Sequence, residues 1–188
     1  MSKVKYRTIE IDGALFDEGF CIYLMELKDG ADTFFYVGMT GDNYYPSARS
    51  AFHRLSGHFD RAERSTQNQL GKHIGERGSY AGIKLKMHYF PIEGFIPIEG
   101  ASKKKGDKNY FLQPRFAEAY QKYKETQREV AKLEKHIIYK LQTHFAGANP
   151  FPLVNQTNGA EWKGLDENYQ NLVDEVMGVV GGFHEQED

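Results

Sequence analysis

An arginine and a histidine one helical turn apart have a spacing suited to phosphate chemistry. Arg54 and His58 are four positions apart, so a helix would place both side chains on one face. The planar guanidinium matches two phosphate oxygens and stabilises charge that develops in a transition state. A histidine beside it could transfer a proton or hydrogen-bond the phosphate. Arg49 and His53 repeat the spacing, and an exposed Arg and His on an amphipathic helix are the ordinary alternative.

Two tyrosines lie in consecutive segments of strand-like composition. Tyr23 belongs to residues 20–27 and Tyr36 to residues 33–38, with a short polar turn between the segments. This pattern predicts a β-hairpin, in which neighbouring strands bring cross-strand side chains together. Two phenols in one site could hold or deprotonate a water molecule. Tyrosine is also common in strands as a core or edge residue, so neither tyrosine alone indicates a site.

Glu134 is a carboxylate within the apolar stripe of a predicted helix. The apolar residues that surround it at helical spacing are Val130, Ile137, Ile138 and Leu141. Burial of an unpaired carboxylate is costly, so a cation, a basic partner or a proton must compensate it. A divalent metal is one solution, because Mg²⁺ prefers oxygen ligands and keeps several of its waters. A glutamate at the rim of the stripe that turns to solvent or pairs with lysine is the alternative.

Other polar residues could support such a site or contact a nucleic acid. Asn155 could orient Glu134 or a phosphate through its amide, although an asparagine close to Pro152 is also typical of a turn. A basic cluster could grip a nucleic-acid backbone, and it consists of Lys103, Lys104, Lys105 and Lys108. A solvated charged loop is an equally good interpretation of these lysines.

The order of the motifs resembles that of the GIY-YIG nuclease family. The resemblance runs from about residue 20 to residue 155, and it rests on CIY 21–23, YVG 36–38, RLSGH 54–58, Glu134 and LVN 153–155. Leu55 and Phe59 also follow the family pattern, which favours the second Arg–His pair over the first. Cys21 stands where the family has glycine.

The resemblance implies a metal-dependent endonuclease of phage, mobile-element or restriction type, with DNA as the expected substrate and RNA as the alternative. The implied catalytic set is Tyr23, Tyr36, Arg54, His58, Glu134 and Asn155. Within it, Tyr23 would be the general base and Glu134 would bind one Mg²⁺ or Mn²⁺ ion. The oligomeric state stays open, and a homodimer would be compatible. A nucleic-acid-binding module that retains the fold without catalysis is the rival hypothesis, which Cys21 and the near-neutral charge would fit.

The elements that must position these residues predict an α+β fold. It consists of a small, mainly antiparallel three-stranded sheet flanked by helices, with one long helix in the C-terminal half. Strands are expected at residues 20–27, 33–38 and 83–90. Helices are expected from Ser47 as N-cap, at residues 67–75, from Pro114 to Gly147, and at residues 168–180. Residues 91–110 are expected to be irregular.

Composition indicates one domain with a distinct C-terminal end. Residues 1–160 are expected to form the nuclease-like domain, with an insertion at about 91–113, and residues 161–188 an acidic, partly helical extension. The net charge of the 188 residues is −2, but the first 160 carry +5. One cysteine excludes an internal disulfide and a cysteine zinc site. The sequence shows no signal-peptide-like or membrane-spanning stretch, so a cytoplasmic protein without a membrane partner is expected.

Overall fold

The computed structural model describes residues 10–42, 46–60, 69–75, 82–100, 107–148 and 151–182. These residues form an α+β fold with a three-stranded antiparallel sheet and one long helix, which confirms the expected fold class. The strands are β1 (Phe20–Asp29), β2 (Asp32–Met39) and β3 (Lys84–Ile92), in the order β2-β1-β3. Gly30, with a φ of 65°, lies in the tight turn between β1 and β2.

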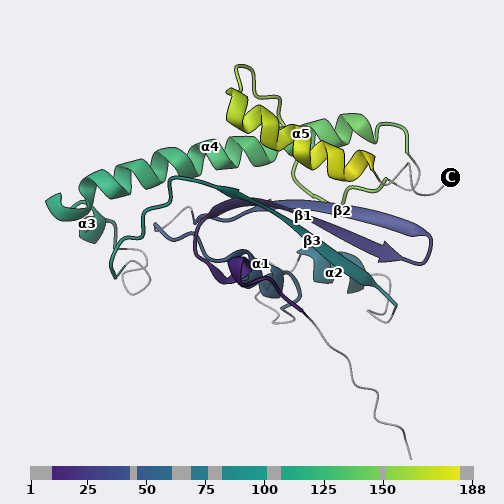
Figure 1. Cartoon of the computed structure of the whole chain (residues 1–188), viewed down its shortest axis with the longest axis horizontal. Helices are drawn as coiled ribbons and strands as arrows, with labels where there is room; N and C mark the ends of the chain where they lie inside the picture. The colour runs from purple at the N-terminus through teal and green to yellow at the C-terminus, as the bar shows by residue number, and fades with distance from the viewer. Residues whose placement is uncertain are drawn as a thin grey trace, which may run out of the picture.

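Helices cover both faces of the sheet, as Figure 1 shows. On one face, Phe20, Ile22 and Leu24 of β1 pack in a core with helices α4 (Pro114–His144) and α5 (Glu167–Gly181). On the other face, Cys21 and Tyr23 of β1 pack toward α1 (Ala51–His58) and α2 (Gln69–Gly75). The central strand is buried from Phe20 to Leu27 because both of its faces are covered, and this explains its nearly continuous apolar sequence.

Helix α1 begins later than the sequence predicts, and the expectation that Ser47 is its N-cap is wrong. Ser50 is the N-cap, and its hydroxyl accepts a hydrogen bond from the backbone N–H of His53. The carbonyl of Ser47 instead accepts hydrogen bonds from the Tyr123 hydroxyl and from the backbone N–H of Asp42. These tertiary contacts hold residue 47 in the loop before the helix.

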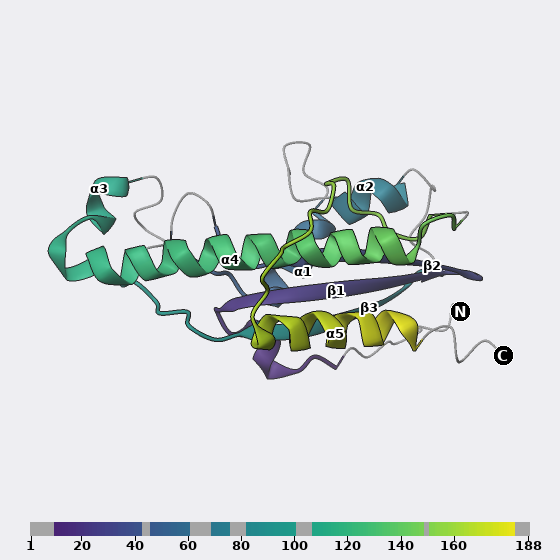
Figure 2. The same cartoon turned by 90° about the horizontal axis from the view of Figure 1, so that it is seen from above.

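The long helix α4 lies beside α5 over the sheet, and Figure 2 shows the two helices from above. The buried residues of α4 are Tyr123, Gln127, Val130, Leu133, His136, Ile137, Ile138 and Leu141. Val173, Val176 and Val180 of α5 belong to the same core. Over the part of the chain that the structure describes, no helix combines the length and the apolar character needed to cross a membrane.

Two short helices lie outside the elements that the sequence predicts. A 3-10 helix, η1 (Gly13–Phe16), lies ahead of β1, and α3 (Lys108–Phe111) lies ahead of α4. Irregular backbone was expected as far as residue 110, whereas the Asp107 carboxylate accepts a hydrogen bond from the N–H of Tyr110 at the start of α3. Such a short helix has too few residues to produce an apolar period.

The segment after α4 returns along the outer side of β2. Leu153 forms a parallel bridge with Phe35, and the backbone groups of Pro152 and Val154 hydrogen-bond to Phe35. Farther on, Gly159 passes so close to α4 that a Cβ there would lie 2.1 Å from the backbone nitrogen of Tyr139. Only glycine allows this approach without displacing the main chain.

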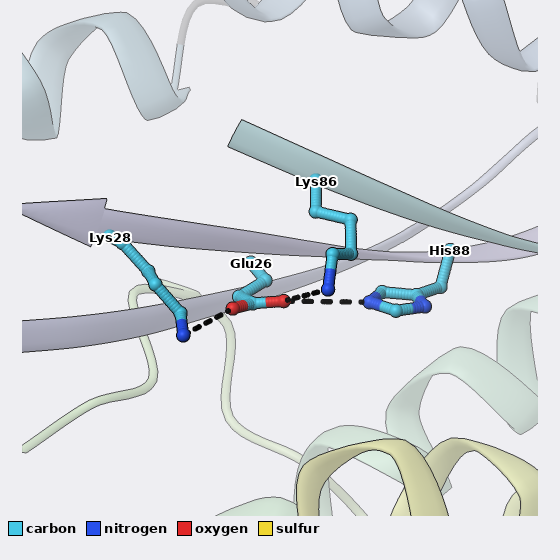
Figure 3. A network of polar contacts seen from close by, with 4 residues as sticks. All are labelled: Glu26, Lys28, Lys86 and His88. Carbon is cyan, nitrogen blue, oxygen red and sulfur yellow. Dashed lines mark ion pairs between the residues drawn. The ribbon is translucent and has the colours of Figure 1, made fainter. Parts of the chain in front are cut away.

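A buried carboxylate on β1 is surrounded by basic side chains (Figure 3). The side chain of Glu26 is 2% exposed, and its oxygens lie 3.5 Å from Lys28 Nζ, 3.6 Å from Lys86 Nζ and 3.7 Å from His88 Nε2. Burial lowers the pKa of His88, while Glu26 raises it. The cluster compensates a charge that would otherwise be costly to bury within the sheet.

We expect a Gly159→Ala substitution to destabilise the protein and a Gly178→Ala substitution to stabilise it. The first Cβ would collide with the backbone of Tyr139, at a cost of roughly 1–3 kcal/mol. The second would meet no atom within 4 Å on α5, and alanine exceeds glycine in helix propensity by about 1 kcal/mol. Chemical denaturation of both variants and the wild type gives the free energies of unfolding. Equal stability of the two variants would contradict the close approach.

Candidate functional site

The position of Tyr23 depends on the glycine opposite it. Tyr23 and Gly38 are cross-strand partners in the β1–β2 hairpin. A Cβ on Gly38 would lie 2.3 Å from the ring carbon Cζ and the hydroxyl oxygen of Tyr23, so the hydroxyl-bearing end of the ring occupies the space over this glycine. Gly38 belongs to the YVG motif but not to the catalytic set that the resemblance implies. Its signal in the sequence is a glycine in an otherwise bulky strand.

The hydroxyl of Tyr23 points to a histidine on α1. Its oxygen lies 2.9 Å from Nε2 of His58, and both side chains are buried. The ring of Tyr36 packs edge-on against the same imidazole, with 4.7 Å between centroids. Tyr23 and Tyr36 have centroids 6.4 Å apart. The hairpin and α1 therefore bring both predicted tyrosines and the predicted histidine into one cluster.

Arg54 adds a positive charge beside the two phenols. Burial would lower its pKa, but the neighbouring tyrosines and Glu134 raise it by more. Burial raises the pKa of Tyr23 to about 12, although Arg54 opposes this increase through its charge and a hydrogen bond. Nε of Arg54 is buried without a hydrogen-bond partner among the described residues. A buried donor of this kind requires an explanation, and an absent ligand is one.

Glu134 reaches the cluster from the middle of α4. It is partly buried, and burial raises the pKa of its carboxyl to about 7, while Arg54 and Lys135 oppose the shift. Its charge in turn raises the pKa values of Tyr23 and Tyr36. Its carboxylate makes no hydrogen bond or ion pair with another residue that the structure describes. The structure thus places Glu134 near the tyrosines and Arg54, at a cost that a bound cation would remove.

Asn155 is bound to the backbone of β2. Its side-chain oxygen accepts a hydrogen bond of 2.9 Å from the N–H of Val37, and its side-chain nitrogen donates one of 2.8 Å to the Val37 carbonyl. These bonds continue the pairing of residues 152–154 with β2. The amide therefore fixes the strand between Tyr36 and Gly38, which is a positioning role, whereas the sequence suggested a contact with Glu134 or with a phosphate.

The remaining predicted residues lie apart from the cluster or outside the described residues. Arg49 Nη1 lies 2.9 Å from Nε2 of His53, so these two residues contact each other, whereas His58 hydrogen-bonds to Tyr23. Lys103, Lys104 and Lys105 lie outside the described residues, and for Lys108 only the backbone, in α3, is described. Cys21 is buried, and burial raises the pKa of its thiol to about 11.

The residues present fit a hard divalent cation held by a single protein carboxylate. Among the described residues, no three His, Cys, Asp or Glu side chains form a group that could bind a metal. A transition-metal site with several protein ligands is therefore not formed by them. Glu134 offers a desolvated carboxylate oxygen that has no hydrogen-bond or ion-pair partner among the described residues, and Mg²⁺ binds to one or two carboxylates together with water and phosphate oxygens.

Comparison with protein-family models, with curated proteins and with solved structures finds no match for this chain. The case for a function therefore depends on the geometry described above.

We expect Gly38→Ala to disrupt the cluster. The added methyl group would occupy the position of the Tyr23 ring and move its hydroxyl away from His58, which would cost roughly 1–3 kcal/mol of stability. Gly19→Ala is the matched control just before β1, because its Cβ would meet no atom within 4 Å. Denaturation measures stability, and NMR of the His58 imidazole reports the hydrogen bond. An unchanged His58 spectrum in Gly38→Ala would contradict this arrangement.

We expect Glu134→Gln to stabilise the metal-free protein at alkaline pH. The folded-state pKa of about 7 exceeds the ordinary value of 4.5, so the wild type loses relative stability as the pH rises from 4.5 through 7. In EDTA the variant should exceed the wild type by roughly 1–3 kcal/mol at pH 8 and match it near pH 4. Mg²⁺ should stabilise only the wild type. A stability difference independent of pH would contradict the shifted pKa.

Proposed function

We propose that this protein is a phosphodiester hydrolase that cuts nucleic acid, with DNA as the expected substrate and one Mg²⁺ or Mn²⁺ ion as cofactor. The observation that carries the proposal is the hydrogen bond of 2.9 Å between Tyr23 and His58, beside Arg54 and Glu134. A phenol, an imidazole, a guanidinium and a carboxylate from three separate elements thus converge. They are the groups that in-line attack of water on a phosphate requires.

Tyr23 and His58 supply a path for the proton of the attacking water. With a pKa of about 12, Tyr23 is protonated at neutral pH, so its hydroxyl donates to Nε2 of His58. As water attacks phosphorus, the phenol oxygen accepts the proton of water while the phenolic proton passes to His58. The bond from phosphorus to the 3′ oxygen breaks, and the leaving oxygen takes a proton from solvent. The products are a 5′-phosphate and a 3′-hydroxyl.

Arg54 and Glu134 are the partly exposed members of the cluster, so a phosphate would meet them first. The unpaired Nε of Arg54 is a donor available for a phosphate oxygen, and its engagement would draw the guanidinium away from Tyr23. Glu134 would hold the metal ion, which supplies Lewis-acid stabilisation of charge on the phosphate. Asn155 would keep Tyr36 and Gly38 in register through Val37.

A nucleic-acid-binding module without catalysis is the second candidate. The complete burial of Tyr23 and its raised pKa favour this candidate, since a base must be reached by water. In that case Arg54 would still bind phosphate, and the lysines at 103–105 and 108 would add backbone contacts. Cleavage distinguishes the two functions directly.

We expect the wild type to nick or linearise plasmid DNA with Mg²⁺ and to leave it intact with EDTA. Glu134→Gln and Tyr23→Phe should each lower the rate at least about 100-fold, because each removes a group that acts in the transition state. Glu125→Gln is the matched control, since Glu125 is exposed on the same helix and accepts a hydrogen bond from the side chain of Gln121.

The assay should include single-stranded DNA and RNA, and circular dichroism should confirm that each variant is folded. Failure of the folded wild type to cut all of these substrates, together with retained binding, would overturn the hydrolase proposal in favour of the binding module. Equal losses in Glu125→Gln and Glu134→Gln would also count against the assigned site.

A further inference from the structure

The second Arg–His pair of the sequence lies next to the candidate site without belonging to the Tyr23 cluster. Arg49 immediately precedes Ser50, the N-cap of α1, and its Nη1 lies 2.9 Å from Nε2 of His53. A guanidinium can only donate, so Nε2 of His53 accepts and the imidazole carries its proton on Nδ1. The pair is therefore a single cation, in which a neutral histidine orients the guanidinium.

Arg49 and Arg54 line the same small pocket. Gly41, Asp42 and Ser47 form its remaining walls. The pocket has a volume of about 20 Å³, enough for one water molecule or one phosphate oxygen. Two arginines and one aspartate among the lining residues give the pocket a net positive charge.

The positive charges of Arg49 and Arg54 both act on His53. Burial lowers the pKa of His53, and the charges of Arg49 and Arg54 lower it further. The first turn of α1 contains no acidic residue, so the positive end of the helix dipole adds to this field. The loop that carries Asp42 is fixed, because its backbone N–H and carbonyl both bond to the Tyr123 hydroxyl.

We propose that Arg49, oriented by His53, binds the phosphate adjacent to the scissile phosphate of the same strand, while Arg54 binds the scissile one. This inference rests on the proposed function. It assigns Arg49 with His53 to one phosphate and Arg54 with His58 to the next. This assignment would align the strand across the N-terminal end of α1. The ligand is thus a polynucleotide strand rather than a single phosphomonoester.

Substrates with single neutral phosphates test the assignment. After the cut is mapped in a DNA oligonucleotide, each phosphate on either side of it is replaced in turn by an uncharged methylphosphonate. For the wild type, one replacement next to the cut should lower kcat/KM about tenfold or more, through loss of a charge-assisted hydrogen bond. Arg49→Gln should show the same loss on the natural substrate, mainly in KM, and no further loss on that replacement.

Lys140→Gln, at an exposed position of α4, is the matched control and should retain the wild-type response. Arg49→Lys should regain part of the affinity, because it keeps the charge without the planar fork. If Arg49→Gln cuts the natural substrate as the wild type does, or stays sensitive to the same neutral phosphate, the assignment is overturned.

A binding measurement separates failure of this inference from failure of the proposed function. Absence of cleavage by the wild type would overturn the hydrolase alone. Fluorescence anisotropy in EDTA then measures oligonucleotide binding against salt concentration. Arg49→Gln should reduce the slope of log K against log [salt] by about one, and Lys140→Gln should leave it unchanged. Equal slopes for the wild type and Arg49→Gln would overturn the phosphate subsite.

Discussion

The contact between the Tyr23 ring and the backbone of Gly38 is the constraint on which the candidate site depends. It requires β1 and β2 to pair in one register, because a shift by one residue would turn the ring to the other face of the sheet. With the ring in place, its hydroxyl meets groups from α1: His58 at 2.9 Å, and Arg54, which also hydrogen-bonds to it. Asn155 then secures the opposite edge of β2 by bonding to Val37.

Charged groups buried around this contact lower the stability of the fold. Glu134 lies next to the mainly apolar buried residues of α4, and burial raises the pKa of its carboxyl. Arg54 carries a buried donor without a partner in the described part of the chain. Glu26, by contrast, is a buried carboxylate with three basic neighbours. Buried charged groups that lack a compensating partner within the protein are expected where a ligand binds.

Sequence reasoning predicted the hairpin, β3, α4 and α5 because their apolar periods are long enough to distinguish strand from helix. It placed the start of α1 at the wrong serine, since both serines suit a cap and only the contact of Ser47 with Tyr123 decides between them. It also proposed Tyr23, Arg54, His58 and Glu134 as a group, and the structure brings them together. The partner of Asn155 and the role of Gly38 depend on spatial contacts that no local pattern records.

The bonds from Asn155 to Val37 join residues that are 118 positions apart. Closure of so long a loop carries a large entropic cost, so we expect this contact to form late in folding. During synthesis the hairpin and α1 leave the ribosome well before α4 and the segment after it. The newly made chain would therefore hold its tyrosines and its arginines without the carboxylate of Glu134 until nearly all of the domain has been translated. Under the proposed function, competence to act on a phosphate would therefore arise only after α4 and Asn155 have been made.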